Sequence, residues 1–149
     1  MTAVDTALDH LSLSITEEIH VRASLAATFA ALLEEMGPSS EGHNGTPMPM
    51  VLEPWPGGRW YRDLGDHNGH LWGHVQAIKA PTLLEITGPL MMSFAVASNL
   101  QYRLAAVNGG TLITLRHTAL GLFPDGYRDA LSQGWPRLFD RIRRRVESA

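Results

Sequence analysis

The sequence predicts an α+β fold in which a curved, seven-stranded antiparallel sheet wraps around a long C-terminal helix. Apolar and polar residues alternate over residues 11–22 and again, in separate segments, over residues 50–119, and this period of two is typical of half-buried strands. A helical period replaces it over a short segment after residue 24 and over a long one near the C-terminus. Because a sheet with one apolar face needs a cover, the long helix is expected to pack against it.

The first strand and the first helix follow each other directly. The strand is expected over Leu11–Arg22, where Glu17 interrupts the apolar face and suggests a bulge or a strand end. Apolar residues three or four apart predict a helix over Leu25–Met36, with Ser24 capping its first free backbone N–H groups. Gly37, which precedes a proline, is expected to end the helix in the left-handed conformation.

Six further strands are expected between the two helices. Residues Pro38–Pro49 show no period and are rich in proline, glycine, serine and asparagine, so we expect a loop with room for one short helical turn. The pair Asn108-Gly109 separates two alternating segments and predicts a tight hairpin. Turn sequences divide the strands, which are expected at Met50–Pro54, Arg59–Asp63, His70–Lys79, Leu83–Thr87, Asn99–Val107 and Thr111–Ala119.

The last helix carries an apolar stripe over about five turns, from Tyr127 to Val146. Pro124-Asp125 stands where a helix start is expected. Pro136 predicts a kink near Ser132, because proline removes one backbone hydrogen bond inside a helix. Gly134 lies on the stripe, so either its backbone packs closely on the sheet or a void opens there. Together with Gly73 and Pro136, it is expected to make the interior hard to fill completely.

Composition excludes several classes of protein. Of the 149 residues, 44% are hydrophobic and 18% are charged, which is unlike a disordered chain. We expect a flexible N-terminus over residues 1–10 and one domain over residues 11–149. A net charge of −3 argues against a nucleic-acid partner. The absence of cysteine excludes disulfides, thiolate zinc sites and a cysteine nucleophile.

The sequence carries no sign of export or of membrane insertion. The N-terminus lacks the basic start and apolar run of a signal peptide. The longest apolar stretch, Pro89–Ala97, is far shorter than the roughly 20 residues that span a bilayer. A cytoplasmic protein without a membrane partner is therefore expected.

Several short motifs, in order along the chain, resemble one superfamily. They are Ile19–Ser24 (IHVRAS) with Phe29, Gly57–Trp60 (GGRW), Trp72–Val75 (WGHV) leading to Ala80-Pro81, Gly110–His117 (GTLITLRH) and Gly134-Trp135. They resemble the START-like superfamily, also called SRPBCC, Bet v 1-like or helix-grip, in the branch similar to the C-terminal domain of activators of Hsp90 ATPase. The resemblance implies a deep, mostly apolar cavity between the concave face of the sheet and the long helix. The tryptophan-rich stretch usual after the first helix of this branch is replaced here by Gly37–Pro49, so details on that side are not implied.

Strand alternation indicates which side chains face this interior. One face of residues 99–107 and the more apolar face of residues 111–119 are expected to point inward, together with the stripe of the last helix. The segment that holds Met91, Met92 and Phe94 suits a flexible gate or, equally, ordinary edge packing or a homodimer contact. The expected ligand contacts are Leu100, Tyr102, Leu104, Ile113, Leu115, His117, Leu131, Trp135, Phe139, Met92 and Phe94.

His117 is the strongest polar candidate. An inward histidine can donate a hydrogen bond to a ligand or act as a general acid or base, with Tyr102 as an outlying partner. The alternative is a core histidine that is satisfied by a backbone carbonyl or by Tyr102.

Three other groups of residues have ordinary structural explanations. His67, His70 and His74 are too few and too far apart for a zinc site, since four strand residues span about 13 Å. The tryptophans Trp55, Trp60, Trp72 and Trp135 can form an aromatic wall, although core packing is their more common role. The arginines from Arg141 to Arg145 are expected to form a solvated helix face rather than a phosphate site.

Three functions follow as hypotheses. The first is the binding of a small apolar or aromatic molecule in the cavity, without a cofactor. The second is a cyclase or hydrolase type of enzyme that uses the same cavity, with His117 as acid–base. The third is an interaction module similar to Hsp90 co-chaperone domains.

Overall fold

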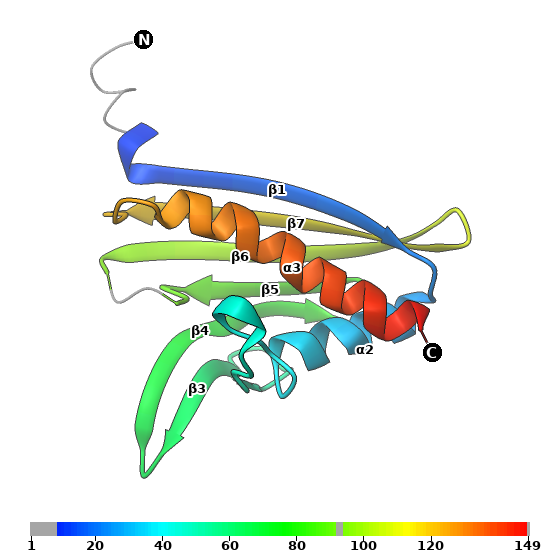
Figure 1. Ribbon diagram of the computed structural model, residues 1–149, viewed down its shortest axis with the longest axis horizontal. Helices are drawn as coiled ribbons and strands as arrows, with labels where there is room; N and C mark the ends of the chain where they lie inside the picture. Colours follow the sequence, from blue (N-terminus) through cyan, green and yellow to red (C-terminus); the bar gives the residue numbers. More distant parts are fainter. Residues whose placement is uncertain (1–8, 92–93, 149) are drawn as a thin grey trace.

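A computed structural model describes residues 9–91 and 94–148 and confirms the predicted architecture. Within these residues, seven strands form one antiparallel sheet in the order β1-β7-β6-β5-β4-β3-β2, and helices α2 and α3 lie on the same face of it (Figure 1). The elements are β1 Ser12–Val21, α2 Leu25–Met36, β2 Val51–Leu52, β3 Arg59–Gly65, β4 Asn68–Lys79, β5 Leu83–Gly88, β6 Val96–Val107, β7 Gly110–Gly121 and α3 Tyr127–Glu147.

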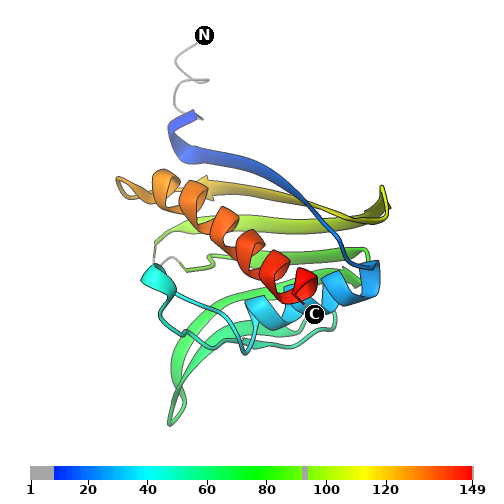
Figure 2. The same cartoon turned by 45° about the vertical axis from the view of Figure 1, so that its right-hand side comes forward.

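The sheet curves around α3, which crosses it diagonally (Figure 2). Consecutive strands from β2 to β7 pair as hairpin neighbours, and β1 adds to the far side of β7. Glu17 pairs with Leu115 in an uninterrupted register, so the expected bulge or strand end at Glu17 is wrong. The ladder tolerates this residue because its side chain is only partly buried. Of the expected flexible terminus, residues 1–8 lie outside the described residues, and Asp9, His10 and Leu11 are helical.

Helix α2 begins as predicted but ends for a different reason. The Ser24 side chain accepts a hydrogen bond from the backbone N–H of Ala27 at 3.1 Å. Gly37 has φ −109° rather than a left-handed value, so the expected left-handed cap is wrong. A Cβ at Gly37 would lie 2.8 Å from the carbonyl oxygen of Leu33, and this lack of space favours glycine.

Residues 38–49 form a closed loop between α2 and β2. It contains one short helical turn, His43–Gly45, for which the prediction left room. The loop is held shut by a bridge between Glu41 and Pro47 and by a hydrogen bond from the backbone N–H of Met48 to the carbonyl of Ser40 at 2.8 Å.

Helix α3 begins at Tyr127, after Gly126, which has a φ of 79° and caps the helix without a side-chain bond. The helix therefore starts two residues after Asp125, later than the start that Pro124-Asp125 predicts. The helix passes through Pro136 and continues to Glu147 as one element. The kink expected near Ser132 stays a prediction.

The core lies between α3 and the concave face of β6 and β7. The inward residues of both strands are almost inaccessible to solvent, as the alternation predicts, and burying such a side chain contributes about 1.5–3 kcal/mol. The apolar stripe of α3 covers them. The main members of this layer are Leu100, Tyr102, Leu104, Ile113, Leu115, His117, Leu138, Phe139 and Ile142.

Candidate functional site

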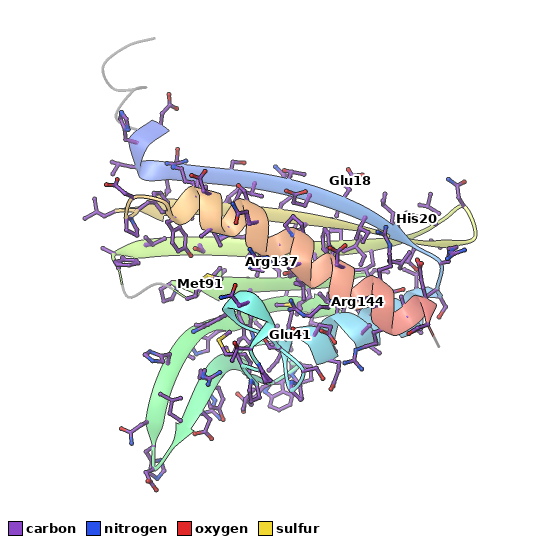
Figure 3. All side chains as sticks on the ribbon, viewed as in Figure 1. Glu18, His20, Glu41, Met91, Arg137 and Arg144 are labelled. Atoms are coloured by element: carbon purple, nitrogen blue, oxygen red, sulfur yellow. The ribbon has the colours of Figure 1, made fainter. Side chains whose placement is uncertain are left out.

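A cavity of about 310 Å³ lies where α3 faces the end of α2, the loop 38–49 and strands β3 and β4. Figure 3 shows three residues of its wall, Glu41, Met91 and Arg137, on three separate segments. Its wall comprises Glu35, Met36, Ser40, Glu41, Gly42, Met48, Trp60, Trp72, Met91, Tyr127, Ala130, Leu131, Gly134, Trp135, Arg137, Leu138 and Arg141. The volume falls within the range of small-molecule sites, at its lower end.

Three of the four tryptophans line this cavity. The indole N–H of Trp60 donates to the carbonyl of Met36 at 2.8 Å, which anchors the ring to the end of α2. The Trp72 ring meets that of Trp60 edge to face, with 5.0 Å between centroids. Trp135 comes from α3. Trp55 is 54% exposed and lies outside the wall, so the aromatic wall has three members rather than four.

The two glycines that sequence reasoning linked to a void behave differently. A Cβ at Gly134 would meet no atom of the described residues within 4 Å, and Gly134 lies in the cavity wall. Of the two expected outcomes at Gly134, a void is therefore the one observed. A Cβ at Gly73 would lie 2.6 Å from the carbonyl oxygen of Thr87. Gly73 thus permits close packing of β4 on β5 and adds no open space, which corrects its expected role.

An ion-pair network forms the polar side of the cavity. Glu35 on α2 is 4% exposed, and its two carboxylate oxygens accept hydrogen bonds from Arg141 at 2.9 Å and from Arg145 at 2.7 Å. Arg141 also lies 3.4 Å from Glu41 of the loop. A solvated face was expected for these arginines. This is wrong for Arg141, because α2 and the loop close over it.

His117 lies beneath the cavity rather than in its wall. The indole N–H of Trp135 donates to Nδ1 of His117 at 3.3 Å, so the neutral ring carries its proton on Nε2. Burial lowers the pKa of His117 to about 4. Within the described residues, His117 Nε2 and the Tyr102 hydroxyl have no hydrogen-bond partner. The expected partner, a backbone carbonyl or Tyr102, is therefore wrong, and the partner is Trp135.

Tyr127 and Met91 meet at one edge of the cavity. The Tyr127 hydroxyl donates to Sδ of Met91 at 3.0 Å, and burial raises the pKa of Tyr127. Phe94, an expected ligand contact, is 47% exposed and lies outside the wall. Met92, another expected contact, lies outside the described residues.

The structure divides the other expected ligand contacts into two groups. Leu131 and Trp135 line the cavity. The remainder pack in the core beneath α3 and lie outside the wall: Leu100, Tyr102, Leu104, Ile113, Leu115, His117 and Phe139. Sequence reasoning did not anticipate the wall residues of the loop, Ser40, Glu41, Gly42 and Met48, because that segment has no period that assigns a facing side.

The described part of the chain holds neither a cluster of metal ligands nor a membrane-spanning helix. No three histidine, cysteine, aspartate or glutamate side chains in that part gather closely enough to hold a metal ion. His67 and His70 are exposed near the turn between β3 and β4, and His74 is exposed further along β4. In the same described residues, no helix has both the length and the apolar character of a membrane span.

The family model described as Activator of Hsp90 ATPase homolog 1-like protein matches residues 26–147. The chain belongs to this family. The match spans α2 except its first residue, the whole cavity wall and α3, and it confirms the resemblance that the motifs indicate. No curated protein matches this AHSA1-like chain.

Solved structures share the fold of this AHSA1-like protein at low sequence identity. Ara h 8.0201 has a TM-score of 0.69 and 18% identity, covering 93% of this chain and 99% of that one. The di-domain ARO/CYC protein StfQ of the steffimycin biosynthetic pathway has a TM-score of 0.66 and 12% identity, and the alignment covers 97% of this chain and 53% of that one. The Aha1 dimer from Colwellia psychrerythraea has a TM-score of 0.64 and 12% identity, and the alignment covers 91% of this chain and 96% of that one. These likenesses show a Bet v 1-like, helix-grip fold.

Proposed function

We propose that this AHSA1-like protein binds a small molecule with an apolar aromatic ring system in the cavity beside α3. The observation that carries the proposal is the open space over Gly134, bounded by the rings of Trp60, Trp72 and Trp135. Aromatic rings favour stacked or edge-on contacts with other flat rings. Methionine side chains from three segments, Met36, Met48 and Met91, complete an adaptable apolar lining.

Binding without catalysis is the better-supported use of this cavity. An acid–base role would require His117 to reach a bound molecule, but His117 lies outside the wall and its Nδ1 already accepts the Trp135 N–H. With a pKa of about 4, the ring is neutral near pH 7 and has no proton to give as an imidazolium. Similarity to StfQ concerns the fold alone. Interaction with Hsp90, which the family description suggests, is the alternative if the cavity takes no ligand.

The test is a thermal-shift screen of bicyclic and tricyclic aromatic compounds against wild type and Gly134→Leu. A compound at about 100 times its Kd adds about 2.7 kcal/mol to the free energy of unfolding, which raises Tm by about 5–10 °C for a chain of this size. Leucine at residue 134 would occupy the open space without a backbone clash, so the shift should disappear.

The matched control is Ser132→Leu, which adds the same side chain to an exposed position of α3 outside the wall. It should keep the full shift. A screen in which no compound raises Tm, or in which Gly134→Leu responds like wild type, contradicts the proposal.

A further inference from the structure

Counted together with Arg145, which pairs with Glu35 from outside the wall, the charged groups at the polar side of the cavity carry one more positive charge than negative. Glu35 and Glu41 face Arg141, and Glu35 also accepts from Arg145. Adding Arg137, which lines the wall, three arginines stand against two glutamates. The excess charge resides on Arg137, because both carboxylates already have arginine partners.

Arg137 has no carboxylate partner among the described residues. Its side-chain hydrogen bond goes to the amide oxygen of Gln133 at 3.5 Å, the outer limit of such a bond. Arg137 and Arg141 are four residues apart on α3 and therefore share one helix face. Figure 3 places Arg137 on the side of α3 that faces Met91 and Glu41. Its guanidinium thus stands at the solvent-exposed rim of the cavity, and its charge is not paired with a carboxylate there.

We infer that the cavity selects aromatic molecules that carry one anionic group, and that Arg137 binds this group. The inference rests on the proposed function, since it concerns the ligand of the same cavity. A carboxylate or sulfonate at the rim accepts two parallel N–H bonds from a guanidinium, which fixes the orientation of the ring behind it. The ring then lies against the three tryptophans.

Cationic and neutral molecules fit this arrangement less well. A cation finds no free carboxylate among the described residues of the wall, since Glu35 and Glu41 are both held by Arg141. A neutral molecule that covers the rim removes water from Arg137 and returns no charged partner, which costs free energy. An anion restores the lost interaction, so it is favoured over a neutral molecule of the same shape.

The test compares two probes of the same shape, 2-naphthoate and 2-naphthamide, by calorimetric titration at pH 7.5. Wild type should bind the naphthoate about five- to tenfold more tightly, as expected for a partly desolvated ion pair. Arg137→Gln should bring the ratio of the two affinities to about one, because it weakens naphthoate binding and removes the desolvation cost that naphthamide meets at Arg137. Arg137→Lys should keep part of the preference, because it retains the charge but not the planar fork. Arg144→Gln, an exposed position of α3 outside the wall, should behave like wild type.

The outcomes separate the inference from the proposed function. Equal binding of both probes in wild type, abolished by Gly134→Leu, would overturn the inference and leave the proposed function standing. A preference for naphthoate that survives Arg137→Gln would also overturn it, because the anion would then be held elsewhere. If wild type binds neither probe while other aromatic compounds of the screen raise its Tm, the inference is overturned and the proposed function stands. If no compound of the screen raises Tm either, both are contradicted.

Discussion

The indole of Trp135 and the imidazole of His117 are joined by a hydrogen bond of 3.3 Å, with the rings edge to face at 5.7 Å. This contact links the middle of α3 to β7. Because it holds the Trp135 ring in one orientation, His117 shapes the cavity without touching its contents. His117 is therefore a positioning residue for the aromatic wall.

The stability of the fold should fall as the pH drops through the titration range of His117. Burial lowers its pKa to about 4 in the folded state, whereas the unfolded chain titrates near 6.5. On acidification the unfolded state binds the proton first. The contribution of neutral His117 to the free energy of unfolding is therefore complete above about pH 6.5 and is lost towards pH 4. Linkage gives a loss of about 2–3 kcal/mol between pH 7.5 and pH 4.5.

Urea denaturation at these two pH values measures the effect, with His117→Leu as the comparison. The variant is less stable at pH 7.5, because Trp135 loses its hydrogen-bond acceptor. Its free energy of unfolding should, however, fall by about 2–3 kcal/mol less than that of wild type between pH 7.5 and pH 4.5. An unchanged pH dependence in the variant would show that His117 does not titrate as a buried neutral group.

Removal of the Tyr102 hydroxyl should not destabilise the protein. Tyr102 is inaccessible to solvent, and its hydroxyl has no hydrogen-bond partner within the described residues. An unpaired buried hydroxyl costs free energy, so Tyr102→Phe should be neutral or should gain up to about 1 kcal/mol. Denaturant unfolding measures this. A loss above about 1.5 kcal/mol would mean that the hydroxyl has a partner in solution.

Gly134→Ala should stabilise α3. Alanine is favoured over glycine in a helix by about 0.5–1 kcal/mol, and the new methyl group would meet no atom within 4 Å. Gly73→Ala is the contrast, because its Cβ would lie 2.6 Å from the Thr87 carbonyl oxygen. This substitution should lower the free energy of unfolding by about 1–3 kcal/mol. Thermal and urea unfolding of the two variants compare them. A destabilised Gly134→Ala would indicate that no void exists at that position.

Breaking the buried ion pair between the helices should destabilise the protein strongly. Glu35→Gln leaves Arg141 partly buried with Glu41 as its remaining carboxylate partner, and the expected loss is about 2–3 kcal/mol. Glu18→Gln, at an exposed position of β1, provides the control and should change little. Equal losses for the two variants would rule out a special role for Glu35.

Much of the fold could be predicted because the spacing of apolar residues along the chain indicates which side chains are buried. The alternation in β6 and β7 identifies Leu100, Tyr102 and His117 as inward, and all three are inaccessible to solvent. The stripe of α3 likewise marks Leu131 and Trp135 as facing the sheet. Local signals also located Ser24 as the cap of α2. These features depend on neighbours in sequence.

The position of the cavity depends instead on contacts between distant segments. The pair between Glu35 and Arg141 joins residues 106 positions apart, and no local pattern specifies it. The loop 38–49 closes the cavity although it has no period, so its facing residues could not be assigned. Sequence reasoning consequently placed the ligand deep under α3, among His117 and its neighbours, whereas the described cavity lies beside the helix.

The most direct test of the account follows the four indole N–H signals by ¹H–¹⁵N NMR during titration with 2-naphthoate. Trp60, Trp72 and Trp135 line the cavity, whereas Trp55 is exposed outside it and serves as an internal control. If the ligand binds in the cavity, the first three signals shift saturably while the Trp55 signal stays unchanged, and no such shifts occur in Gly134→Leu. Shifts confined to Trp55, or none in wild type, would contradict binding in the cavity.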